Sequence, residues 1–492
     1  MKKWIKYFIY ILPVTLYFSY YPLIHFGASE SMNFEISLPI IWLLLFDILT
    51  FIILIRQKKL LRGLKGKWMW LLFPIFMTIS ILWSLNSLRG LLTVGILWLI
   101  YFAVYAMFEL KGLFDKDFQK TFLKWFFGAT IVICVWCFIQ CLLDIFGVSR
   151  EYSLLCEGCT YSRFGFPHPN GFSIEPQFMG NLLIAPAMII CWILLRKQNS
   201  KNLERKSSRG DNFYNGSVGA HTKLQFRDSL RDRCKNYSGS DFLDSKFLPF
   251  CLLLISSTLF LTFSRGAIYA FIVGMIFMSV FLLVREKKEI LKRVGLVWGL
   301  ILFSFLFTLN IQGLMAEIGP TNDTYKIGVS KVLNHLSLGI IDTREEVVEN
   351  PVENFEEGGK EEAIFDGYVK ESTDVRLSLN DNAMRVWSKD FMTMMFGVGL
   401  GGAGQALYVN GMSDSPKEII QNQYVSLLLE VGAIGFLLFI LTLGLIIKAV
   451  LKKNNVLMIL SLMLAFGISL LFFAGLPNAL QIYLLVAILV FL

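Results

Sequence analysis

Charged residues are scarce in this sequence of 492 residues. Asp, Glu, Lys and Arg make up 17% of the chain, whereas hydrophobic residues make up 55%, and this balance excludes a soluble globular protein. Four histidines are few for metal chemistry, and the eight cysteines show no repeated metal-ligand spacing. Aromatic residues are abundant, with 44 Phe and 11 Trp, as is typical of side chains that face lipid and its interfaces.

Long apolar runs predict repeated crossings of a bilayer. A hydrocarbon core of roughly 30 Å needs about 20 apolar residues for each helix. We therefore predict an all-α polytopic membrane protein with about 12 transmembrane helices and one large extracytoplasmic loop between spans nine and ten. The predicted spans are 4–24, 38–55, 68–83, 91–109, 121–147, 177–195, 247–263, 267–284, 294–311, 421–449, 456–473 and 477–491.

The distribution of Lys and Arg predicts the orientation of these spans. With the N-terminus in the cytoplasm, the cytoplasmic segments hold 33 of the 46 basic residues, as the positive-inside rule requires. An even number of spans then places both termini in the cytoplasm. Because topology accounts for the net charge of +9, no nucleic-acid partner is expected.

Two long polar segments separate the groups of spans. One of them, 196–246, is basic and rich in Ser, Asn and Gly, which predicts a disordered cytoplasmic loop. The other, 312–420, has 18 acidic and 9 basic residues. Its middle, 344–375, is expected to be partly helical or mobile, and its end, from Asn380 to Gly404, is expected to be ordered. The predicted parts are 1–195 (spans one to six), 196–246 (basic loop), 247–311 (spans seven to nine), 312–420 (extracytoplasmic loop) and 421–492 (spans ten to twelve).

Four polar clusters near the predicted outer face need an explanation. Arg265 lies in a hairpin of two spans with no room for a loop, where an arginine is costly unless it is paired or faces a wet cavity. It is either an interfacial anchor or an anion-binding group, since a guanidinium suits phosphate. The other three clusters are Arg163 to Glu175, Arg385 with the glycine-rich stretch 397–404, and Gln421 to Gly435.

Several of these residues also have ordinary structural explanations. Glu175 precedes Pro176, where a carboxylate caps a helix, and Asn422 is equally well placed to cap the helix that follows. That helix is long enough to project from the membrane or to bend at Gly432 or Gly435. Glu430 in its apolar part requires a partner that the sequence does not name.

Two further observations keep other interpretations open. Asp47 and Asp144 are acids within predicted spans, and they are the best support for an alternative function as a proton-coupled transporter. Cys156 and Cys159 lie in a predicted outer connection, where they form a disulfide or remain two free thiols. The remaining membrane cysteines are most simply packing residues.

Four segments follow one another along the chain in this order: FSIEPQF, TFSRGAIYAFIVG, AMRVWSKDFMTMMFGVGLGG and NQYVSLLLEVGAIGFLL. Together they resemble the O-antigen ligase and Wzy-type polymerase family of bacterial envelope glycosyltransferases. The resemblance implies a glycosyltransferase, independent of metal and other cofactors, that moves a glycan from a polyprenyl-diphosphate carrier to an acceptor hydroxyl. The expected location is the outer face of the bacterial cytoplasmic membrane. The expected partners are the lipid-linked oligosaccharide and the bilayer; a chain-length regulator is left open.

The resemblance also implies roles for individual residues. Arg265 and Arg385 match positions where the family carries functionally important arginines, which would hold the diphosphate. Fixed cations there stabilise the charge of the departing diphosphate. Arg163 is a candidate third cation. Glu175 is the first candidate for a general base and His168 the second.

On the acceptor side, the sequence departs from the ligase pattern. Ligases of this family typically carry a histidine at the position of Gln421, and a glutamine amide orients a hydroxyl but takes no proton at neutral pH. This departure favours a polymerase of repeat units, with Gln421, Asn422 and Tyr424 lining the acceptor side. The alternatives are a ligase that passes finished glycan to a lipid, protein or wall acceptor, and a transporter or flippase.

Overall fold

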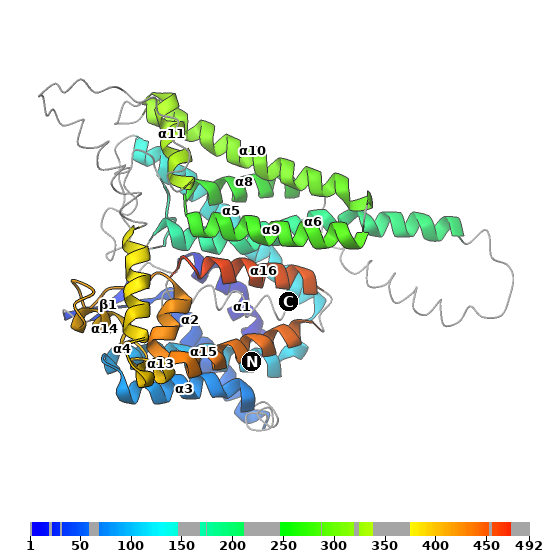
Figure 1. Cartoon of the computed structure of the whole chain (residues 1–492). Helices are drawn as coiled ribbons and strands as arrows, with labels where there is room; N and C mark the ends of the chain where they lie inside the picture. The colour runs from blue at the N-terminus through cyan, green and yellow to red at the C-terminus, as the bar shows by residue number, and fades with distance from the viewer. Residues whose placement is uncertain are drawn as a thin grey trace, which may run out of the picture.

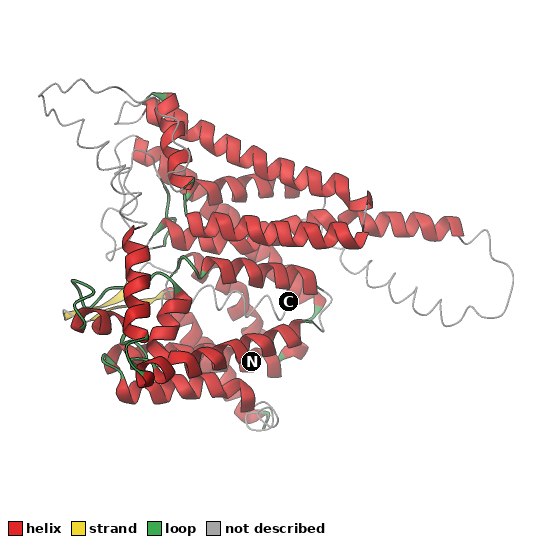
Figure 2. Ribbon diagram, in the orientation of Figure 1, coloured by secondary structure: helices red, strands yellow, loops and turns green. Residues whose placement is uncertain are grey.

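The computed structural model is a bundle of long helices (Figure 1), and most of the residues that it describes are helical (Figure 2). This mostly helical architecture agrees with the predicted all-α polytopic membrane protein. The described residues are 2–18, 22–29, 32–58, 68–145, 168–173, 175–210, 247–286, 288–318, 324–337, 374–451 and 455–473.

Helices follow the predicted apolar runs closely. Every predicted span from 4–24 to 456–473 contains helix in the described part of the chain, and 477–491 lies outside it. The helices of the bundle are α1 (Lys2–Tyr17), α2 (Leu38–Arg56), η2 (Trp68–Leu71), α3 (Leu72–Ser80), η3 (Ile81–Trp83), α4 (Ser87–Glu109), η4 (Lys111–Leu113), α5 (Lys116–Ile145), α6 (Pro176–Gly210), α8 (Phe247–Leu261), α9 (Arg265–Glu286), α10 (Lys288–Ile318), α15 (Gln423–Val450) and α16 (Val456–Ser469).

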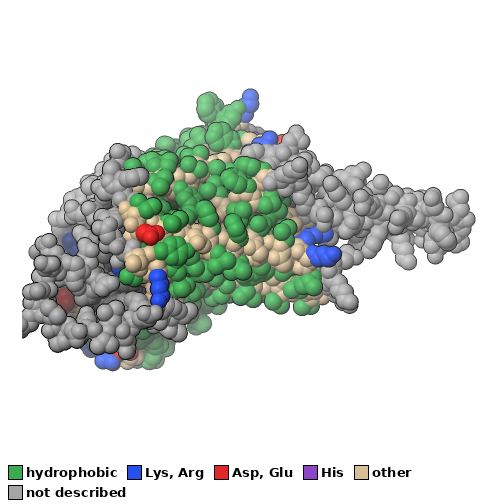
Figure 3. Space-filling view, turned by 90° about the horizontal axis from the view of Figure 1, so that it is seen from above, with side chains coloured by type: hydrophobic (Ala, Val, Ile, Leu, Met, Phe, Trp, Pro, Cys, Tyr) green, Lys and Arg blue, Asp and Glu red, His purple; other side chains and the backbone are tan. Residues whose placement is uncertain are grey.

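Seven of the described helices are long and apolar enough to cross a membrane. The apolar helices 68–83, 247–261 and 456–469 are shorter. The count of twelve spans therefore stays a prediction. Figure 3 shows one face covered largely by hydrophobic side chains, with the visible Lys and Arg side chains towards its margins, as expected for a surface in lipid.

The structure adds a short β-hairpin to the predicted all-α architecture. Strands β1 (Pro22–Ser29) and β2 (Met32–Ser37) form an antiparallel hairpin in which Phe26 pairs with Phe34. The first span was predicted to reach residue 24, but α1 ends at Tyr17. Proline at position 22 removes a backbone donor that a continuing helix needs, and the Ile and Phe residues that follow favour a strand.

Helix α6 extends beyond its predicted end. It continues to Gly210, so the first part of the segment predicted to be disordered, 196–210, is helical. Lys, Arg, Gln, Glu and Leu in this part have good helix propensity, which the polar composition had masked. Residues 211–246 lie outside the described part.

The helices α6, α8, α9 and α10 run side by side, and α16 lies between them and α15 (Figure 1). At one end of the bundle lie α11 (Tyr325–Leu336) and a helix at 374–387, drawn in yellow across the ends of the long helices. We call this the α11 end. The short helices α13 (Phe391–Phe396) and α14 (Ala403–Val409) complete it.

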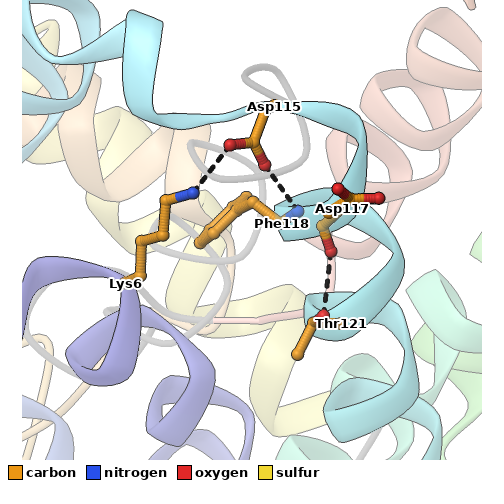
Figure 4. Close-up of polar contacts among 5 residues, drawn as sticks. All are labelled: Lys6, Asp115, Asp117, Phe118 and Thr121. Atoms are coloured by element: carbon orange, nitrogen blue, oxygen red, sulfur yellow. Dashed lines mark hydrogen bonds and ion pairs between the residues drawn. The ribbon is translucent and has the colours of Figure 1, made fainter. Parts of the chain in front are cut away.

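An ion pair and an aromatic stack join α1 to the start of α5. Lys6 Nζ lies 2.8 Å from Asp115 Oδ2, and the other carboxylate oxygen of Asp115 accepts the Phe118 N–H at 2.8 Å (Figure 4). The pKa of Asp115 is held below its ordinary value by Lys6 and by this N–H. Phe118 stacks on Tyr10, with ring centroids 5.2 Å apart, so α5 is fixed where it begins.

Candidate functional site

Arg265 is the first residue of α9, directly after a tight turn. Helix α8 ends at Leu261, and Phe263 in the turn takes a left-handed backbone conformation, with φ +47°. Ser264 Oγ accepts the Ala267 N–H at 3.4 Å, which caps the new helix. The predicted hairpin without a loop is therefore present, and it places Arg265 at the positive end of a helix dipole.

Glycines let neighbouring helices approach this turn closely. A Cβ atom at Gly266 would lie 2.6 Å from Cβ of Phe472, and one at Gly180 would lie 2.9 Å from Cβ of Ser264. Gln177 also donates a hydrogen bond to the backbone oxygen of Phe472. The turn is thus held between α6 and the end of α16.

Helix α11 docks on the same turn from the other side. His335 Nε2 lies 3.2 Å from the backbone oxygen of Phe263, and the Tyr269 hydroxyl donates to the backbone oxygen of Leu336. Because a carbonyl oxygen only accepts, Nε2 of His335 carries the hydrogen and Nδ1 is the acceptor nitrogen. Sequence reasoning had found no reason to select His335.

The surroundings of His335 are electropositive. Its pKa is lowered from 6.5 to about 3, first by burial and then by Arg265, with smaller contributions from His168 and Arg376, although the hydrogen bond to Phe263 acts in the opposite direction. The imidazole is therefore neutral at physiological pH. Residues from three distant segments thus meet around this ring.

A clamp on α5 positions the chain between His168 and Glu175. Gln140 donates from Nε2 to Asn170 Oδ1 and to the backbone oxygen of Gly171, both at 3.1 Å. The Gly171 N–H donates back to Gln140 Oε1 at 2.9 Å. Gly171 has φ +64°, a conformation that favours glycine, so this residue forms the turn before α6.

Glu175 immediately precedes α6 and is partly buried. Burial raises the pKa of its carboxyl group, and the positive charge of Arg376 lowers it in part. Arg376 lies on the helix 374–387, on the same face as the buried residues Leu379, Ala383 and Val386. This face turns towards the bundle, so the structure brings Arg376 to Glu175.

Arg385 has a different position on the same helix. It lies nine residues from Arg376, which corresponds to half a turn around the helix and roughly 13 Å along it. Its side chain is 67% exposed and pairs with Asp381 at 2.7 Å. Of the three predicted catalytic residues, the structure therefore brings Glu175 and Arg265 into one region, together with Arg376 and His335, which the sequence did not indicate.

A family model described as O-antigen ligase matches residues 250–440. The match includes Arg265, His335 and Arg376, whereas His168 and Glu175 precede it. This match supports the O-antigen ligase family for the segment 250–440. The family transfers glycans, which supports the coarse activity expected from the resemblance. No match was found among curated proteins or among solved structures.

Within the matched segment 250–440, two of the predicted acceptor residues use their polar atoms within the fold. Asn422 Oδ1 accepts the N–H groups of Tyr424 at 3.0 Å and Val425 at 3.2 Å, and so caps α15. The Tyr424 hydroxyl donates to the backbone oxygen of Gly467 at 2.8 Å, which joins α15 to α16. Gln421 differs, because its buried Oε1 has no hydrogen-bond partner in the described part of the chain. Arg163 lies outside the described residues.

The glycine-rich stretch 397–404 supports a bend in α15. Gly432 has φ +65° and ψ −173°, which confirms a bend at one of the two glycines considered. The Gly399 N–H donates to the backbone oxygen of Glu430 at 2.9 Å. The Glu430 carboxylate accepts the N–H groups of Gly401 and Ala403 and interacts with the charge of Arg89, which are the partners that the sequence could not name.

The intramembrane acids and the cysteines singled out in the sequence lie outside this site. Asp47 is 5% exposed, and neither of its carboxylate oxygens has a hydrogen-bond partner among the residues that the structure describes. The side chain of Asp144 is outside the described part, as are Cys156 and Cys159. Among the described residues, no group of three His, Cys, Asp or Glu side chains could hold a metal ion. The buried free cysteines, consistent with a packing role, are Cys134, Cys137, Cys141, Cys191 and Cys251.

Proposed function

We propose that the protein polymerises lipid-linked oligosaccharide repeat units at the outer face of the bacterial cytoplasmic membrane. The growing chain on its polyprenyl diphosphate is the donor, and an incoming repeat unit is the acceptor. The α11 end is then the outer end of the bundle, and both termini lie in the cytoplasm. Basic residues in the last turns of α9 (Arg285) and α15 (Lys448) agree with this orientation.

The observation that carries the proposal is that Arg265 and Arg376 both lie close enough to His335 to lower its pKa, while Arg376 also acts on Glu175. Glycosyl transfer leaves negative charge on the departing diphosphate. Two guanidinium groups, together with the N-terminus of α9, supply fixed positive charge for it. The neutral His335 adds no positive charge of its own. Its hydrogen bond to Phe263 fixes the position of α11 against the turn before Arg265.

Glu175 is the proposed general base. It takes the proton of the acceptor hydroxyl while that oxygen bonds to the anomeric carbon and the diphosphate departs. A base works best when its pKa is close to the working pH, and burial raises the pKa of Glu175 in that direction. His335, with a pKa of about 3, is a much weaker base. His168 remains the second candidate.

A ligase is the second candidate function, because the matching family model is described as O-antigen ligase. Such an enzyme would transfer finished glycan to a lipid, protein or wall acceptor. Gln421 in place of a histidine favours the polymerase.

The size of the lipid-diphosphate-linked glycan tests the proposal. It would be measured in cells lacking the gene and in cells complemented with wild type or Arg265→Ala. A polymerase predicts single repeat units on deletion and a ladder restored by wild type but not by Arg265→Ala. Long chains that accumulate on the carrier without reaching their final acceptor would identify a ligase and overturn the polymerase.

A further inference from the structure

Three side-chain amides, on the helix 374–387 or at the start of α15, have a buried oxygen atom without a hydrogen-bond partner among the described residues. They are Asn380 Oδ1, Gln421 Oε1 and Gln423 Oε1. Gln423 is only 8% exposed as a whole. Buried polar atoms in folded proteins nearly always have a partner, so three unpartnered amide oxygens at one junction indicate that something else supplies the hydrogens.

The three amides belong to one junction between the helix 374–387 and α15. Leu379 and Ile420, the chain neighbours of Asn380 and Gln421, pack in the same apolar cluster. Asn380 is one helical turn from Arg376, and therefore on the same side of its helix. The junction therefore begins one helical turn from Arg376, the arginine that acts on Glu175.

The end of α16 joins this junction to Arg265. The Gln423 N–H donates to the backbone oxygen of Leu470 at 2.9 Å. Two residues further along, Phe472 lies against Gly266, the residue after Arg265. The start of α15 is thereby linked, through the end of α16, to the turn that carries Arg265.

The chemistry of the amides selects the kind of ligand. An amide oxygen only accepts, so its partner must be a hydrogen-bond donor. An ionised diphosphate and a polyprenyl chain have no donors, whereas every free hydroxyl of a sugar has one. We propose that Asn380, Gln421 and Gln423 form a subsite for the hydroxyl groups of the acceptor glycan.

This inference rests on the proposed function and divides its site into two halves. The arginines bind the anionic diphosphate of the donor, and the amides bind the neutral sugar of the acceptor. Asn422 and Tyr424 are not part of the subsite, because their polar atoms already bond to the backbone of α15 and α16.

The test uses two variants that remove an amide and keep its size, Asn380→Leu and Gln423→Met. The matched control is Asn382→Leu, because Asn382 lies on the same helix but donates to the backbone oxygen of Met412 at 3.0 Å. Thermal unfolding of the purified full chain in detergent is followed with two probes. One is a single-repeat oligosaccharide released by mild acid from the lipid-linked glycan of the same bacterium; the other is farnesyl diphosphate.

We expect the oligosaccharide to stabilise wild type and the control, and to bind each amide variant roughly tenfold more weakly. Farnesyl diphosphate should stabilise all four proteins equally. Without ligand, the amide variants should unfold at a higher temperature than wild type, since a buried unpartnered oxygen is removed, and the control at a lower one.

Unchanged oligosaccharide binding by Asn380→Leu and Gln423→Met would overturn the subsite, as would a wild type that the oligosaccharide does not stabilise. These outcomes are separate from failure of the proposed function. A normal glycan ladder with Arg265→Ala would remove the polymerase, whatever the amide variants bind.

Discussion

Arg376 lies close enough to Glu175 to lower the pKa that burial raises. The two residues come from distant parts of the chain, one before α6 and the other on the helix 374–387. Their approach makes this helix a part of the site, because its buried face carries the arginine towards the bundle. It also separates Arg376 from Arg385, which the same helix turns outward to Asp381.

The first prediction compares these two arginines. Arg376→Ala should reduce polymer formation by roughly 100-fold or more, because a fixed charge aimed at the leaving group is lost. Arg385→Ala should stay within about fivefold of wild type, as expected for an exposed ion pair. Glycan ladders from complemented deletion cells, at matched protein levels, give the comparison. The opposite ranking would restore Arg385 to the role that the family resemblance implied.

The second prediction concerns the pH dependence of the reaction. If Glu175 acts as the base, only its carboxylate is active, so kcat/KM should rise with pH through a pKa above the ordinary value of 4.5. Removing the positive charge of Arg376 disfavours the carboxylate. In Arg376→Gln the rise should therefore occur at higher pH, measured on the residual activity in membrane vesicles.

Glu175→Gln provides the control for this profile. It should lose nearly all activity and show no rise with pH in the remainder. A fully active Glu175→Gln protein would exclude Glu175 as the base and leave His168 as the candidate to test.

The sequence predicted the apolar helices well, because a span is a local property of composition and length. It also located the hairpin at Arg265 and the bend at Gly432, since a missing loop and an isolated glycine are visible in the chain itself. The β-hairpin after α1 was missed because its short strands lie beside an apolar run that reads as one continuous span.

The candidate site was predicted only in part, because its members meet through tertiary structure. Arg376 and Arg385 are both arginines in a polar segment, and the family motif favoured the one nearer the glycines. The signal that separates them is the spacing of Arg376 with Leu379, Ala383 and Val386, which places four residues on one helical face. Because the sequence did not predict a helix at 374–387, this spacing could not be interpreted as one helical face. No local pattern marks His335.

The third prediction concerns the close approach of α9 to the end of α16. Gly266→Ala would bring a Cβ atom to 2.6 Å from Cβ of Phe472, so Phe472 or the turn before Arg265 must move. We expect a loss of about 1–3 kcal/mol in stability together with reduced activity. Gly299→Ala on α10 is the control, since nothing lies within 4 Å of its added Cβ atom. Thermal unfolding in detergent should leave Gly299→Ala unchanged or slightly stabilised.

The fourth prediction uses the unusual pKa of His335. In the folded protein this pKa is about 3, but in the unfolded chain it returns to 6.5. Below pH 6.5 the unfolded chain therefore binds more protons at this residue, and folding stability should fall as the pH decreases from 6.5 towards 3.

His335→Gln keeps an N–H for the backbone oxygen of Phe263 but does not titrate. Its unfolding temperature should match that of wild type at pH 7 and exceed it at pH 5, because the carboxylates that titrate there are common to both proteins. Parallel curves for the two proteins between pH 7 and pH 5 would show that His335 is protonated in the fold and that the arginines do not control its charge.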